Sequence, residues 1–121
     1  MTLRTLPLAL LLCTLLPACD EGGDEEEGPN VECATATVPK FSEMGAAWSK
    51  CTACHSATLT GAARQAAPVG INFDNFADAR THAQKAMSEV YEGEMPLPGQ
   101  PELTEGEKTQ IYNWASCDTP Q

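Results

Sequence analysis

The sequence has few basic and few aromatic residues. Among its 121 residues, seven lysines and arginines stand against 17 aspartates and glutamates, which gives a formal net charge of −10, and aromatic side chains make up 6%. Nucleic-acid binding requires a basic face, so this charge balance argues against it. An acidic chain of this kind is compatible with a basic protein partner.

The sequence also lacks convincing β-strands and internal repeats. No segment shows the alternating pattern of a half-buried strand, whereas three segments have helical spacing and are separated by loops rich in glycine and proline. We therefore expect a small all-α fold with three to four helices. A domain of fewer than about 100 residues with few large apolar side chains is short of hydrophobic core, which leaves room for a buried apolar cofactor.

The first 18 residues have the features of a secretory signal. Arg4 precedes an apolar run over residues 6–16, which is too short to span a membrane. The segment ends in Leu-Pro-Ala followed by Cys19, which resembles the lipobox of bacterial lipoprotein signal peptides. The resemblance implies removal of residues 1–18 and acylation of Cys19. The alternative is an ordinary signal peptide that leaves Cys19 as a stray thiol.

Residues 19–37 are expected to form an acidic, flexible tether. Residues 20–27 hold six acids and no apolar side chain, so they should stay solvated and extended by self-repulsion. Residues 38–121 then form a single folded domain. With its lipid on Cys19, the chain is predicted to be exported and anchored to a membrane, facing the periplasm or the cell exterior.

The six cysteines can be divided by position. Cys13 leaves with the signal, Cys19 carries the lipid, and two others form a Cys-x-x-Cys motif. Cys33 and Cys117 remain, one near each end of the folded part. Because exported proteins fold in oxidising surroundings, we expect a disulfide between them. Two separate buried thiols are the alternative.

The three helical patterns can be given approximate bounds. The first covers about residues 39–50 and places Phe41, Met44 and Trp48 on the same face as Cys51. The second covers about residues 75–90, with Asp74 as a plausible N-cap. The third begins with a capping box, in which Thr104 is the N-cap and Glu107 lies three residues on, and it is predicted to end near residue 116.

The strongest chemical signal is Cys51-Thr52-Ala53-Cys54-His55. Two thiols at this spacing can reach the two vinyl groups of one porphyrin, and the adjacent imidazole can then bind the iron. A redox-active disulfide is an alternative, but it normally lies in a thioredoxin-like α/β fold. A zinc site is another, but it would need a second ligand pair that the sequence lacks.

With this motif the chain resembles the monohaem class I cytochromes c over about residues 38–117. The attachment motif is highly specific, and a loop with Pro68, a Met95-Pro96 pair and a C-terminal helix with aromatic residues follow it in order. The resemblance implies thioether bonds at Cys51 and Cys54, with His55 as the proximal and Met95 as the distal iron ligand. It also implies that the Pro68 carbonyl accepts a hydrogen bond from His55, the alternative being an ordinary loop proline.

Met95 is also favoured by its own surroundings, because the prolines that follow stiffen its loop. A thioether is a soft, neutral ligand that favours ferrous iron. The rival ligands are Met87, on the apolar stripe of a helix, His82, on a polar face, and Met44, on the same helix as Cys51. An open coordination site is a further alternative.

The expected function is electron transfer through one covalently bound haem c, with redox proteins as partners and no enzymatic activity. A six-coordinate haem has no open position for a substrate. The alternative is a ligand-binding or sensor module with five-coordinate iron. Arg64, Arg80 and Lys85 are candidates for pairing with haem propionates, or they are plain surface charges.

Overall fold

The computed structural model describes residues 27–121. The predictions for the signal (residues 1–18), for Cys19 and for the acidic run up to residue 26 lie outside the described residues. In chain order the elements are η1 (Phe41–Glu43), α1 (Gly45–Cys51), η2 (Gly61–Arg64), α2 (Phe76–Thr81), α3 (Ala83–Tyr91) and α4 (Glu105–Ser116). All regular structure in residues 27–121 is helical, which confirms the all-α prediction.

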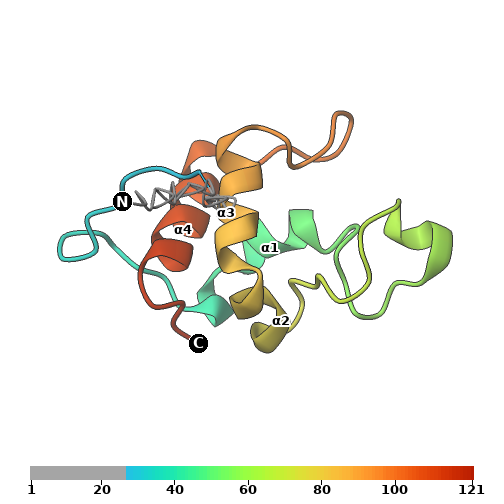
Figure 1. Cartoon of the computed structure of the whole chain (residues 1–121), viewed down its shortest axis with the longest axis horizontal. Helices are drawn as coiled ribbons and strands as arrows, with labels where there is room; N and C mark the ends of the chain where they lie inside the picture. The colour runs from blue at the N-terminus through green and yellow to red at the C-terminus, as the bar shows by residue number, and fades with distance from the viewer. Residues whose placement is uncertain (1–26) are drawn as a thin grey trace, which may run out of the picture.

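Helix α4 begins and ends as its sequence predicts. The Thr104 hydroxyl accepts a hydrogen bond from the Glu107 backbone N–H at 3.3 Å, and the Glu107 carboxylate accepts one from the Thr104 N–H at 2.7 Å. This reciprocal pair satisfies two N–H groups that the first turn would otherwise leave without partners. In Figure 1, α3 and α4 lie side by side, and α1 lies behind α3.

The other two predicted helices are each broken once. At Met44 the chain turns from the 3-10 helix η1 into α1, and at His82 (φ −106°, ψ 16°) it turns from α2 into α3. The N-cap of α2 is Asn75, whose side chain accepts from the Asp78 N–H at 2.9 Å. Asp74, the expected cap, instead accepts hydrogen bonds from the Ser56 hydroxyl and the Ala57 N–H, so it fixes the turn after the Cys-x-x-Cys motif.

Within the core, aromatic rings join α1, α4 and the loop before α2. Trp114 of α4 is fully buried and meets Trp48 of α1 edge-on, with ring centroids 5.4 Å apart. Trp48 in turn stacks on Phe73 at 5.2 Å. Offset stacks and edge-to-face pairs at these distances contribute about 0.5–1.5 kcal/mol each beyond the area that they bury. This cluster holds the end of α1 against the segment around Phe73.

The described part of the expected tether is packed against the helices. Cys33 forms a disulfide with Cys117, as expected, with a Cα–Cα distance of 5.6 Å. The Asn113 side chain donates to the Thr37 carbonyl at 3.0 Å. Gly28 lies so close to Met87 that a Cβ atom there would clash with its methyl group. The folded part therefore begins about ten residues before residue 38.

We expect the Cys33→Ala, Cys117→Ala double variant to lose about 2–4 kcal/mol of unfolding free energy. The bridge joins residues 84 positions apart, so its removal releases a long loop in the unfolded chain. Urea unfolding followed by tryptophan fluorescence measures the loss. Reduction of the disulfide in the unaltered protein should lower its urea midpoint about as much as the double substitution does. An unchanged midpoint in both experiments would show that the bridge adds no stability.

Within residues 27–121, no helix is both long and apolar enough to cross a membrane.

Candidate functional site

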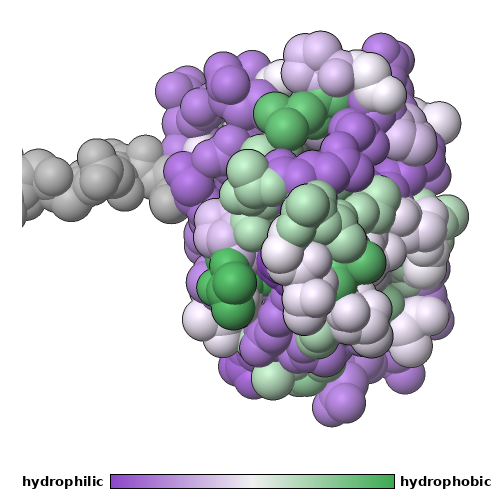
Figure 2. Space-filling view, turned by 90° about the vertical axis from the view of Figure 1, so that its right-hand side faces the viewer, coloured by the Kyte–Doolittle hydropathy of each residue, from purple (hydrophilic) through white to green (hydrophobic). Residues whose placement is uncertain are grey.

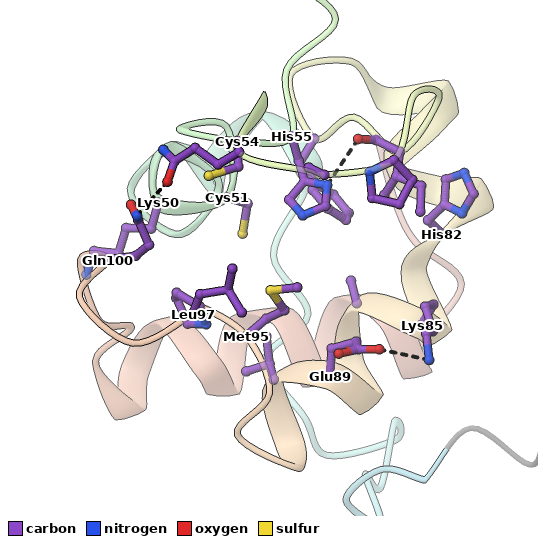
Figure 3. Close-up of a pocket in the computed structure, with 18 of the residues that line it drawn as sticks. Lys50, Cys51, Cys54, His55, His82, Lys85, Glu89, Met95, Leu97 and Gln100 are labelled. Carbon is purple, nitrogen blue, oxygen red and sulfur yellow. Dashed lines mark hydrogen bonds and ion pairs between the residues drawn. The ribbon is translucent and has the colours of Figure 1, made fainter. Parts of the chain in front are cut away.

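A cavity of about 290 Å³ opens between the Cys-x-x-Cys turn, the 65–71 loop, α3 and the 95–103 loop. Its wall is almost entirely apolar, and its volume is at the lower end of the range for small-molecule sites. Figure 3 shows Cys51, Cys54 and His55 on one side of this space, with Met95 and Leu97 across from them. The sequence-predicted ligands therefore converge on one apolar cavity that is open along one side.

Cys51 and Cys54 enter the cavity from the end of α1. Cys51 is the last residue of that helix, and the chain then turns so that the N–H groups of Cys54 and His55 both bond the Cys51 carbonyl, at 3.2 and 2.8 Å. Both thiols are free and partly buried. Burial, with a smaller contribution from the negative charge of Glu107, raises the pKa of Cys51 to about 12. Cys51 is therefore a neutral thiol at physiological pH.

Three contacts orient His55. Its backbone carbonyl accepts from the Phe73 N–H at 2.8 Å, and its ring meets the Phe73 ring edge-on at 5.5 Å. Its Nδ1 lies 3.2 Å from the carbonyl oxygen of Ile71. With the proton on Nδ1, this nitrogen donates to Ile71 and Nε2 is left as a free lone-pair donor. Burial lowers the pKa of His55, which favours the neutral imidazole that a metal requires.

The partner of His55 differs from the one implied by the family resemblance. The acceptor is the Ile71 carbonyl, whereas the Pro68 carbonyl accepts from Arg64 at 2.6 Å. The loop turns between these two residues, with Gly70 at φ 91°, and this turn brings the Ile71 carbonyl to the imidazole. Pro68 itself is a wall residue of the cavity.

Met95 is held at the mouth of the cavity by the end of α3. The chain leaves that helix through Gly93 at φ 79°, a conformation that glycine adopts without strain, and the Met95 N–H bonds the Glu89 carbonyl at 3.0 Å. In Figure 3 the Met95 sulfur points into the space below the cysteines. Further along the loop, the Gln100 side chain donates to Gln65 at 2.8 Å and so ties the two loops together. No pattern in the sequence predicts this link.

The rival ligands are placed differently. Met44 is fully buried in the core, and Met87 is buried where it accepts from the Ser116 hydroxyl; neither lines the cavity. His82 is a wall residue and lies at one edge of the space in Figure 3. Among the alternatives, only His82 therefore borders the cavity.

Charged residues and exposed apolar residues line or adjoin the cavity. Lys85 pairs with Glu89 at 2.8 Å on α3. Val69 is 91% exposed beside the wall residue Pro68, and Leu97 is 44% exposed on the Met95 loop. Figure 2 shows the face that carries the 61–70 segment, on which apolar residues form separate spots among hydrophilic ones.

Lys50, at the other end of the cavity, links α1 to α4. Its ammonium group donates to the Glu102 carbonyl at 2.7 Å and pairs with the Glu107 carboxylate. Hydrogen bonds from Lys50 and from the Thr104 N–H lower the pKa of Glu107 to about 2. Glu107 thus serves both the cap of α4 and the lysine at the cavity wall.

This carboxylate should make stability depend on pH in a defined window. Because the folded pKa of Glu107 is below its ordinary value of 4.5, its contribution is present above pH 4.5 and is lost as the pH falls toward 2. Between pH 4.5 and pH 2, we expect the urea midpoint of Glu107→Gln to fall less than that of the wild type. Glu105→Gln, in the same helical turn, is the control and should keep the wild-type slope. Equal slopes for wild type and Glu107→Gln would contradict the assignment.

Comparisons of the chain with protein-family models, with curated proteins and with solved structures found no match. The fold and the site alone define the class of this protein. It is a small helical domain with two thiols, an imidazole and a thioether around an apolar cavity.

Proposed function

We propose that this chain is a c-type cytochrome that carries electrons through one covalently bound haem. The observation that carries the proposal is the convergence of Cys51, Cys54 and His55 on one side of an apolar cavity, with Met95 across from them. Cys51 and Cys54 would hold the porphyrin as thioethers. His55 and Met95 would bind the iron.

Two observations count against a redox-active disulfide. Reactive Cys-x-x-Cys thiols lie at helix N-termini and have lowered pKa values. Here Cys51 lies at the C-terminal end of α1, where the helix dipole disfavours a thiolate, and its pKa is raised to about 12. A neutral thiol of this kind suits a permanent bond to carbon better than repeated thiol exchange.

The donor set also argues against zinc. Structural zinc sites use four cysteine, histidine or carboxylate ligands in a tetrahedron. No group of three or more such side chains that could hold a metal ion occurs among residues 27–121. One imidazole and one thioether on opposite sides of an apolar cavity are donors that haem iron accepts, so the residues present fit this cofactor.

When bound, the haem supplies one-electron redox chemistry. The residues of the chain then have three tasks. The apolar wall excludes water, the Ile71 carbonyl fixes the proton on Nδ1 of His55, and the stiff loop after Met95 keeps its thioether in place. No position is left for a substrate, so the proposed role is that of a carrier and not of an enzyme.

A second candidate is a ligand-binding module with five-coordinate iron. It is favoured by one observation: the loop that carries Met95 is largely exposed, and a single side-chain bond, from Gln100 to Gln65, ties it to the opposite loop. If Met95 stayed off the iron, the cavity could admit a small diatomic ligand.

Export follows from the same proposal, because the thioethers of c-type haem and the Cys33–Cys117 bridge both suit an extracytoplasmic protein. We propose that a lipid on Cys19 anchors the chain to a membrane facing the periplasm or the cell exterior, and that its partners are redox proteins.

The deciding experiment is expression with a cytochrome maturation system, followed by intact mass and absorption spectra. We expect the mass of one haem beyond that of the polypeptide and a ferric spectrum with a methionine–iron charge-transfer band. A polypeptide mass without haem would refute the proposal. Haem without that band, together with rapid carbon monoxide binding, would favour the five-coordinate module.

A further inference from the structure

Arg64 is the most deeply buried charged residue near the cavity, with 4% of its surface exposed. All five N–H donors of its guanidinium are used. Nε donates to Ala67 O, Nη1 to Ser56 O and Asn72 Oδ1, and Nη2 to Pro68 O and Ile71 O, at 2.6–3.1 Å. Because no N–H donor is left for another acceptor, Arg64 cannot pair with a haem propionate while these hydrogen bonds are in place.

One of these acceptors is shared with the proximal imidazole. The Ile71 carbonyl lies 3.0 Å from Nη2 of Arg64 and 3.2 Å from Nδ1 of His55. A carbonyl oxygen has two lone pairs and can accept both bonds. The positive guanidinium draws electron density toward itself, however, so the oxygen that it polarises is a weaker acceptor for the imidazole N–H.

Further hydrogen bonds, which run through Asn72 and Asp78, fix the position of Arg64. Asn72, which accepts from Arg64, donates to the Asp78 carboxylate at 2.6 Å, and Asp78 also accepts from the Asn75 side chain at 2.9 Å. The chain from Asp78 through Asn72 and Arg64 to the Ile71 carbonyl joins the first turn of α2 to His55. Such an arrangement keeps the guanidinium at one distance from the carbonyl.

We propose that Arg64 is a positioning residue that tunes His55 through the Ile71 carbonyl. The inference rests on the proposed function. A strong hydrogen bond from a ligating imidazole makes the ring a better electron donor and so favours ferric iron. By weakening that bond, Arg64 keeps the imidazole a weaker donor and favours the ferrous state. The loop at 64–72 is thus an element that sets the reduction potential as well as a wall of the cavity.

The test uses the matured, haem-loaded protein and the variant Arg64→Met, which keeps an unbranched apolar stem and removes all five donors. We expect its equilibrium constant for reduction to fall about tenfold, which is ~59 mV for one electron. In NMR spectra of the ferrous protein, we expect the Nδ1 proton of His55 to move downfield as its bond to Ile71 strengthens.

Arg80→Met is the matched control, because Arg80 is exposed on α2 and its loss removes the same charge. Arg80→Met should leave the Nδ1 proton resonance in place and should lower the potential less. The proposal is overturned if Arg64→Met leaves that resonance unchanged, which would mean that Arg64 acts by charge alone. It is also overturned if the two variants have equal potentials.

If Arg64→Met does not fold, the unaltered protein still tests the proposal. The Nη protons of Arg64 should exchange with water slowly, since all four are bonded in a buried site, and exchange as fast as in an exposed arginine would overturn the proposal. Absence of haem from the mass of the unaltered protein would instead refute the proposed function. In that haem-free protein, a His55 with its proton on Nε2 would overturn the inference independently.

Discussion

We expect replacement of Cys51 and Cys54 together by serine to leave the polypeptide without covalently bound haem. Both thiols reach the cavity from the turn at the end of α1, and a thioether requires the sulfur. The expected change is from one haem per chain to none, measured by intact mass after expression with the maturation system. Each single variant should keep a haem held by one thioether, at a lower yield.

The Cys33→Ala, Cys117→Ala variant is the control for the loss of two cysteines. Its cysteines form the disulfide and do not line the cavity. It should therefore carry one haem per chain although it is less stable. Covalent haem in the Cys51→Ser, Cys54→Ser variant would show that other residues hold the cofactor.

The elements that the sequence predicts well are those set by neighbouring residues. Helix α4 has its N-cap, its reciprocal glutamate and its apolar face within 12 residues, so its bounds could be predicted. The breaks at Met44 and His82 could not, because neither residue is a glycine or a proline. Tertiary packing on both sides determines where these helices turn.

The site could be predicted where it depends on residue type, and not where it depends on backbone direction. The motif with Cys51 and Cys54 identifies the thiols, and Cys33 pairs with Cys117 as expected. The family resemblance points to the Pro68 carbonyl as the acceptor for His55, whereas the structure places the Ile71 carbonyl there. Residue type cannot separate the two, because any carbonyl in the loop has the same chemistry. The choice of acceptor depends on how the loop turns.

The turns of this loop include residue types that rarely adopt the left-handed backbone conformation. Gln65 and Ala66 follow η2 at φ 51° and 70°, in the left-handed region that usually favours glycine. This bend folds the loop back over Arg64, so that the guanidinium can reach the carbonyls of Ala67, Pro68 and Ile71. A sequence pattern gives no sign of such a bend, so the sequence alone leaves Arg64 as a candidate for pairing with a haem propionate or as a plain surface charge.

The second large effect concerns the distal side. We expect Met95→Leu to lower the reduction potential by roughly 0.2–0.3 V, within the roughly 0.8 V range that axial ligands span. Leucine has a similar volume and is apolar, so the loop and its bond to the Glu89 carbonyl should persist while the thioether is lost. The methionine–iron charge-transfer band should disappear, and ferrous haem should bind carbon monoxide without displacing a ligand.

Met87→Leu is the matched control, because Met87 is buried between α3 and α4 and does not line the cavity. It should keep the wild-type potential and spectrum.

If Met95→Leu instead has the wild-type spectrum and the same rate of carbon monoxide binding, Met95 is not the ligand. The choice then lies between His82, the other ligand candidate on the wall, and an open iron, and His82→Ala separates them. A spectrum changed by that substitution indicates bis-histidine ligation and a carrier of lower potential. A spectrum left unchanged indicates five-coordinate iron, and with it a module that binds a ligand instead of passing electrons.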